Sequence, residues 1–111
     1  MIETDNIRGY NDLILLSLLL DDDSYGYSIS KQIKELTYGM YIIKETTLYS
    51  AFNRLKKLGY IESYNGSETR GRARTYYKIT EKGKEFYYKC CREWKDTKKV
   101  VNKFIREENN D

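Results

Sequence analysis

The chain has 111 residues, a length typical of a single small domain. Charged side chains make up 33% of it and the net charge is +3, so much of the surface must be ionic. Histidine, the side chain that most often serves as a general base near neutral pH, does not occur in the sequence. The two cysteines, Cys90 and Cys91, are adjacent, so they cannot join distant segments, and no second pair exists with which they could hold zinc. The composition argues against an enzyme, a disulfide-stabilised domain and any need for a cofactor.

The most apolar stretch, residues 13–20, is far shorter than the about 20 residues that span a membrane. It is interrupted by Ser17, and the residues before it include three acids, unlike the basic start of a signal peptide. We therefore expect a cytoplasmic protein that does not associate with membranes.

The charge is unevenly distributed along the chain. Residues 54–84 contain nine basic and three acidic side chains, a net charge of +6, whereas the rest of the chain carries −3. One basic region on a nearly neutral protein is typical of a nucleic-acid binder. The alternative is an ordinary solvated face.

In chain order, residues 1–9 show no clear hydrophobic period and predict a loose arm. Residues 10–21 are apolar on nearly all faces of a short helix, which must then be buried on most sides. A second helix is predicted at residues 25–37, with the Ser24 hydroxyl as its N-terminal cap. Its apolar stripe recurs at helical spacing and consists of Ile29, Ile33 and Leu36.

A third helix is predicted at residues 45–58, followed by Gly59 at the position past a helix end where a positive φ is common. Its apolar face is expected to be buried and comprises Leu48, Ala51, Phe52, Leu55 and Leu58. The opposite face carries hydrogen-bonding and cationic groups with few acids, namely Thr46, Thr47, Tyr49, Ser50, Asn53, Arg54 and Lys57.

β-Branched and aromatic residues predict two strands, at 60–64 and 75–79, that form a hairpin with a long basic tip. Thr80 is predicted to cap a last helix at 81–107, which would be about 40 Å long at 1.5 Å per residue. Apolar residues follow heptad-like spacing along this helix. Because such a helix overshoots a domain this small, we expect a second subunit to cover its far half. The residues predicted at this dimer interface are Trp94, Val101, Phe104 and Ile105.

This order predicts a mainly α fold of the α+β class: a winged helix-turn-helix at residues 10–80 with a two-stranded β wing, then a dimerisation helix at 81–107. In such a fold the third helix enters the major groove of DNA, and the wing lies along the backbone or in the minor groove. Asn53 and Arg54 can form bidentate bonds to base edges, and the wing arginines can approach phosphates. The residues predicted to contact double-stranded DNA are Thr46, Thr47, Tyr49, Ser50, Asn53, Arg54, Arg70, Arg72 and Arg74.

Several of these residues have a purely structural alternative. Tyr49 could pack against the second helix instead of offering its phenol to a phosphate. Asn53 could be a neutral surface residue, and the wing arginines could remain solvated.

Four motifs resemble the PadR family of winged-helix transcriptional regulators, at normal spacing over residues 11–105. They are Ser24-Tyr-Gly-Tyr, Glu45-Thr-Thr-Leu-Tyr-Ser-Ala-Phe-Asn-Arg-Leu, Leu58-Gly-Tyr-Ile-Glu-Ser and Gly71-Arg-Ala-Arg-Thr-Tyr-Tyr-Lys-Ile-Thr-Glu-Lys-Gly. By this resemblance Thr47, Leu48 and Tyr49 match the Thr-Leu-Tyr of the recognition helix, and Arg72 and Arg74 match the wing motif. Ser50 and Ala73 stand where the family often has proline, so the helix start and the wing path are expected to differ in detail.

The C-terminal region is similar to the compact branch of that family, in which one long helix per subunit makes the dimer and packs against the partner's first helix. In multidrug-sensing members a tryptophan on this helix stacks on flat aromatic ligands in a central pore, and Trp94 falls at the matching position. Lys98 replaces an acid there, which would disfavour cationic ligands. The alternative is that Trp94 is only a dimer-core residue. The other positions matching the pore are Asp12, Leu13, Tyr87, Cys90, Cys91 and Lys98.

The resemblance implies a homodimeric repressor, autoregulatory in the simplest case, that binds a pseudo-palindromic operator and is released by a flat aromatic effector near Trp94. Two alternatives stay open. The chain could be a protein-interaction or adaptor module without specific DNA binding. The vicinal thiols of Cys90 and Cys91 could instead sense redox state or a metal.

Overall fold

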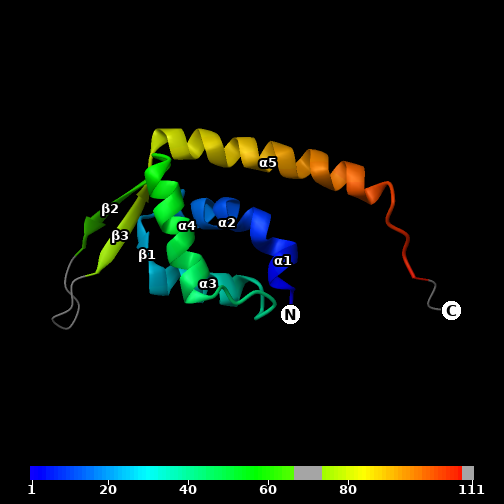
Figure 1. Ribbon diagram of the computed structural model, residues 1–111, viewed down its shortest axis with the longest axis horizontal. Helices are drawn as coiled ribbons and strands as arrows, with labels where there is room; N and C mark the ends of the chain where they lie inside the picture. Colours follow the sequence, from blue (N-terminus) through cyan, green and yellow to red (C-terminus); the bar gives the residue numbers. More distant parts are fainter. Residues whose placement is uncertain (67–73, 109–111) are drawn as a thin grey trace.

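The computed structural model describes residues 1–66 and 74–108. Helices dominate this part of the chain and a small antiparallel sheet accompanies them, so the predicted mainly α fold is confirmed (Figure 1). The elements are α1 (Thr4–Ile7), the 3-10 turn η1 (Arg8–Tyr10), α2 (Asn11–Leu19), β1 (Ser24–Tyr25), α3 (Gly26–Leu36), α4 (Glu45–Lys57), β2 (Ile61–Asn65), β3 (Thr75–Ile79) and α5 (Glu81–Asn102).

One hydrophobic core holds these elements together. As its apolar run predicts, α2 is enclosed on most sides, because it packs against α4, β3 and α5. Ile29 and Ile33 of α3 and the buried face of α4 cover the same core, which the hairpin closes. Leu36 and Leu58, also predicted on these buried faces, are instead 68% and 45% exposed, because each lies where its helix ends. The largest fully buried side chains are Leu15, Leu16, Leu19, Ile29, Phe52, Leu55 and Ile61.

The sheet has three strands in the order β1-β3-β2 rather than the two that were predicted. The prediction of Ser24 as a helix cap is wrong: Ser24 belongs to β1 and pairs with Tyr77, and α3 begins after Tyr25 without a side-chain cap. A two-residue strand is too short to leave an alternating pattern. Its backbone groups are satisfied by the edge of β3, which lies far away in sequence.

The prediction of a loose arm at residues 1–9 is also wrong, because this segment forms α1 and η1. The Ile2 N–H donates to the Met40 carbonyl at 2.8 Å, and Ile2 and Ile7 pack against the core. Two isolated apolar residues give no periodic pattern in the sequence, so the ordering of this segment by contacts with the core could not be predicted.

The residues that connect the hairpin to α4 and to α5 agree with the sequence predictions. Gly59, just past α4, has a φ of +80°, the left-handed region that glycine adopts without strain. The Thr80 hydroxyl accepts a hydrogen bond from the Gly83 N–H at 3.0 Å and so caps α5.

Helix α5 runs over α2 and then continues past the rest of the domain (Figure 1). It ends at Asn102 rather than at residue 107, so the predicted end is wrong and Phe104 and Ile105 lie beyond it. Both side chains are exposed, so no packing within the chain supports further helical turns. Among the described residues, no helix has the length and apolar character needed to cross a bilayer.

Candidate nucleic-acid interface

The polar face predicted for the third helix is the solvent face of α4. Its apolar residues recur every three to four positions and are buried, so the intervening residues point outward. Thr47 is half-buried. The exposed residues of the predicted set are Thr46, Tyr49, Ser50, Asn53 and Arg54.

Part of this face borders a depression of about 280 Å³ between α4 and the start of the chain. Arg8 of η1 lines it opposite Thr47 and Ser50, and its guanidinium Nη2 donates to Asp5 Oδ1 at 2.6 Å. Arg8 is not among the residues predicted to contact DNA, because residues 1–9 were expected to form a loose arm. The available signal was a cation placed shortly before a buried helix.

Tyr49 packs on α3, in line with the structural alternative. A Cβ atom added to Gly26 would lie only 2.4 Å from its hydroxyl oxygen, so the absence of a side chain at Gly26 makes room for the phenol. The ring also lies edge-on to Phe52, with 5.8 Å between centroids. Tyr49 still exposes 41% of its surface, so it lies at the junction of α3 and α4 and borders the outer face.

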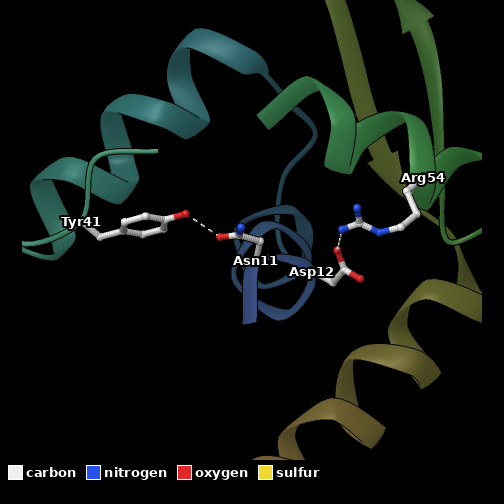
Figure 2. Close-up of polar contacts among 4 residues, drawn as sticks. All are labelled: Asn11, Asp12, Tyr41 and Arg54. Atoms are coloured by element: carbon white, nitrogen blue, oxygen red, sulfur yellow. Dashed lines mark hydrogen bonds and ion pairs between the residues drawn. The ribbon is translucent and has the colours of Figure 1, made fainter. Parts of the chain in front are cut away.

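Arg54 lies in the last turn of α4 and forms an ion pair with Asp12 of α2 (Figure 2). The Arg54 side chain is 50% exposed and that of Asp12 is 25% exposed. The structure thus joins one residue predicted to contact DNA to one predicted to line an effector pore.

The three strands carry a row of tyrosines. Tyr25, Tyr76 and Tyr64 are direct neighbours across the three strands, with ring centroids 5.3 and 5.7 Å apart. The Arg74 guanidinium lies 4.3 Å above the Tyr25 ring, a cation–π geometry that holds this side chain just before β3. Arg70 and Arg72 lie outside the described residues.

The Tyr64 hydroxyl donates to Asp23 Oδ2 at 2.5 Å, which connects the wing to the loop before β1. This hydrogen bond to a carboxylate is the main cause that raises the pKa of Tyr64, since it stabilises the neutral phenol. Asp23, in the acidic loop before β1, therefore holds β2 through Tyr64.

On the other side of the domain, α2 and α5 border a cavity of about 730 Å³. Three of the predicted effector residues, Leu13, Trp94 and Lys98, line this cavity together. Tyr10 lies edge-on to Trp94 with 5.1 Å between centroids, and Trp94 remains 41% exposed. The other predicted residues are elsewhere: Asp12 faces Arg54, and the cavity lining does not include Tyr87, Cys90 or Cys91.

The two thiols are half-buried and unbonded to each other. Burial raises the pKa of Cys90, and the carboxylates of Glu93 and Asp12 add to the effect. Hydrogen bonding to Cys91 raises the pKa of Tyr87. A reactive cysteine requires the opposite shift, so the environment of Cys90 does not favour a redox sensor at that thiol. No cluster of three or more potential metal ligands occurs in the part of the chain that the structure describes.

Comparison with known proteins agrees with this geometry. The model of the Transcriptional regulator PadR-like family matches residues 15–89. A transcriptional regulator from Clostridium thermocellum is 60% identical, with a TM-score of 0.87 over 92% of this chain and 99% of that one. A Lysinibacillus sphaericus relative is 42% identical over 105 residues, 95% of this chain and 96% of the relative. Bacillus subtilis PadR, solved in complex with operator DNA, is 20% identical and shares the fold, with a TM-score of 0.63 over 90% of this chain and 49% of that one. The chain therefore belongs to the PadR-like family of transcriptional regulators.

Proposed function

We propose that the protein is a homodimeric repressor that binds a pseudo-palindromic operator, including one upstream of its own gene. The observation that carries this proposal is the exposed polar face of α4 beside a wing that carries Arg74 just before β3. Bacillus subtilis PadR, which shares this fold, binds operator DNA. The same arrangement in this chain would present α4 to a major groove.

The chemistry of the face fits base and backbone contacts. Asn53 can pair bidentately with an adenine, and the hydroxyls of Thr46 and Ser50 can bond to either strand. Arg74, held over Tyr25, can approach a phosphate, and Arg70 and Arg72 complete the proposed wing contacts. Thr47 and Tyr49 would mainly hold α4 against the rest of the domain.

The exposed apolar residues at the C-terminal end of α5 and just beyond it support the dimer. Phe104 and Ile105 expose 79% and 63% of their surfaces, and Val101 in the last turn of α5 exposes 49%. Side chains of this kind gain free energy when a second copy covers them. We assign the dimer interface to Trp94, Val101, Phe104 and Ile105.

The cavity at Trp94 supports an effector site. Its volume of about 730 Å³ lies in the range of small-molecule pockets. A flat aromatic molecule could stack on the exposed indole, and Lys98 favours an anionic or neutral one. To act as an inducer, it must bind the DNA-free form better than the bound form.

Fluorescence anisotropy with labelled DNA from upstream of the gene, titrated at two salt concentrations against scrambled DNA, tests the proposal. Sequence-dependent binding that Asn53→Ala weakens on the operator alone would support it. Lys31→Ala, on the exposed surface of α3, is the matched control and should bind as the wild type does. Equal binding to both DNAs, or none, with an intact dimer would favour the adaptor function instead.

A further inference from the structure

Two consecutive residues at the start of α2 reach the two ends of the recognition helix. The Tyr41 hydroxyl donates to Asn11 Oδ1 at 2.6 Å, and Arg54 Nη2 donates to Asp12 Oδ1. Figure 2 shows the two side chains leaving α2 in opposite directions, Asn11 toward Tyr41 and Asp12 toward Arg54. Tyr41 lies in the segment that leads into α4, and Arg54 in its last turn. We call Asn11 and Asp12 the α2 clamp.

The contact on the Tyr41 side is buried. Asn11 is 3% and Tyr41 6% exposed, so no bulk solvent competes for this hydrogen bond. Burial raises the pKa of Tyr41, although the bond to Asn11 opposes the effect, so the phenol stays a neutral donor. A buried polar pair of this kind has a unique geometry, because any displacement leaves both groups unsatisfied.

The contact on the Arg54 side lies where three helices meet. Asp12 belongs to α2, bonds to α4, and is near enough to Cys90 of α5 to affect that thiol electrostatically. Helix α2 also packs along α5. The orientation of α5 is therefore connected to the C-terminal end of α4 through α2, which packs on α5 and bonds to α4 by its Asp12 carboxylate.

We propose that Asn11 and Asp12 are positioning residues that fix the orientation of α4 against α5, and that Arg54 serves this clamp rather than reading a base. This inference rests on the proposed DNA-binding function. In a dimer joined through α5, the clamp would set the angle at which each α4 meets its half-site. Specific binding needs that angle, whereas non-specific attraction to phosphates depends mainly on charge.

The clamp and a direct DNA contact by Arg54 predict opposite effects of one substitution. If Arg54 binds DNA itself, Asp12→Asn releases the guanidinium and removes a negative charge, so the affinity rises. If Arg54 serves the clamp, Asp12→Asn loosens α4, and operator affinity falls about fivefold to tenfold, as expected for a pair of coupled residues. Binding to scrambled DNA then stays within about twofold, since sequence-independent binding is electrostatic.

The experiment measures operator and scrambled DNA binding for the full chain, Asp12→Asn, Arg54→Gln, both together, and the charge swap Asp12→Arg/Arg54→Asp. Asp22→Asn, an exposed acid in the loop after α2, is the matched control. The clamp predicts that the double variant binds no worse than either single variant and that the swap regains most of the affinity. Tighter binding by Asp12→Asn, additive losses, or a swap no better than the double variant would overturn it.

Hydrogen exchange of the α4 amides separates this inference from the proposed function because it requires no DNA. Asp12→Asn should speed exchange in the last turn of α4, and Asp22→Asn should not. If the wild type fails to discriminate the operator but exchange responds in this way, the repressor function fails and the clamp stands. If exchange is unchanged in Asp12→Asn, the clamp fails whatever DNA the protein binds.

Discussion

Asn11 and Ser24 are the buried polar residues of the described chain, and Asn11 is the one tied to a distant side chain. Its partner Tyr41 lies 30 residues away in sequence, so the bond forms only when α2 and the segment before α4 are both in place. Loss of this bond is costly mainly because it leaves a buried acceptor without a donor, and that unsatisfied group lowers the stability of the fold.

Tyr41→Phe is expected to lower the free energy of unfolding by about 1–3 kcal/mol, the usual cost of an unsatisfied buried group. The ring is retained, so the loss reports the hydroxyl alone. Urea unfolding followed by circular dichroism measures it. Tyr38→Phe is the control, because Tyr38 is 96% exposed and its hydroxyl is already in water. Equal stability of Tyr41→Phe and the wild type would show that water satisfies Asn11.

The Cys90 thiol allows a prediction about pH. Burial raises its pKa in the folded chain above the value in the unfolded chain, so its contribution to stability is present below the unfolded pKa and is lost as the pH rises through the folded one. In a Cys91→Ser variant at about pH 8, iodoacetamide should therefore alkylate Cys90 more slowly in the folded protein than in denaturant. Equal rates in both states would contradict the shift and reopen the thiol-sensor alternative.

At the scale of elements, the start of α5 shows how closely the hairpin and the long helix approach. A Cβ atom on Gly83 would lie 2.1 Å from the Tyr60 carbonyl oxygen and 2.8 Å from Ile79 Cγ1. The carbonyl belongs to backbone and cannot rotate away. The first turn of α5 thus packs closely against the backbone at Tyr60, just before β2.

Gly83→Ala should destabilise the fold by about 1–3 kcal/mol, the usual cost of overpacking, although alanine favours a helix more than glycine does. Thermal or urea unfolding measures the change. Gly9→Ala provides the control, since an added Cβ there meets nothing within 4 Å. A Gly83→Ala variant as stable as the wild type would mean that α5 can move away from the Tyr60 carbonyl without loss of stability.

The tyrosine row gives a prediction for the wing. Tyr25→Leu removes the ring beneath Arg74 and should weaken operator binding about twofold to fivefold, the size of an exposed cation–π contact. Arg74→Ala should lose at least as much, and adding Tyr25→Leu to it should change little further. Tyr88→Leu, an exposed tyrosine of α5, is the control for loss of a ring. Full additivity of the two wing substitutions would show that Tyr25 does not position Arg74.

The elements that could be predicted are those with a strong local period. The amphipathic patterns placed α3 and α4 within one or two residues of Gly26–Leu36 and Glu45–Lys57, and the exposed face of α4 followed from them. The strand β1 could not be predicted, because these two residues form a strand only by pairing with β3. The bond from Asp12 to Arg54 joins residues 42 positions apart, so no local pattern indicates it. The domain boundary at residue 80 stays a prediction.

At the scale of the whole molecule, the single chain is elongated, with extents of 59 × 29 × 22 Å. Helix α5 produces this shape, because it continues past α2 while the rest of the domain packs at its first half (Figure 1). Exposed aromatic and aliphatic side chains gather toward its far end. A second copy that covers them would also fix the distance between two α4 helices, which a palindromic operator requires.

The double variant Val101→Glu/Phe104→Glu is expected to convert the dimer into a folded monomer. Burial of one Phe side chain contributes about 1.5–3 kcal/mol, and a twofold dimer loses it twice, so dimerisation should weaken at least about 100-fold. Both residues are exposed in the single chain, so its own fold should persist. Sedimentation velocity measures the dimer, and anisotropy on a half-site and a full operator shows whether cooperation between half-sites is lost.

Lys99→Glu is the matched control for that variant, because it introduces the same acid on α5 two positions before Val101, about 200° around the helix from it. It should remain dimeric and bind the full operator. If the double variant stays dimeric, the subunits must associate through another surface, and the spacing of the recognition helices could not be set by α5. A wild-type monomer at micromolar concentration would exclude the dimer altogether, and with it a palindromic operator bound by two preassembled subunits.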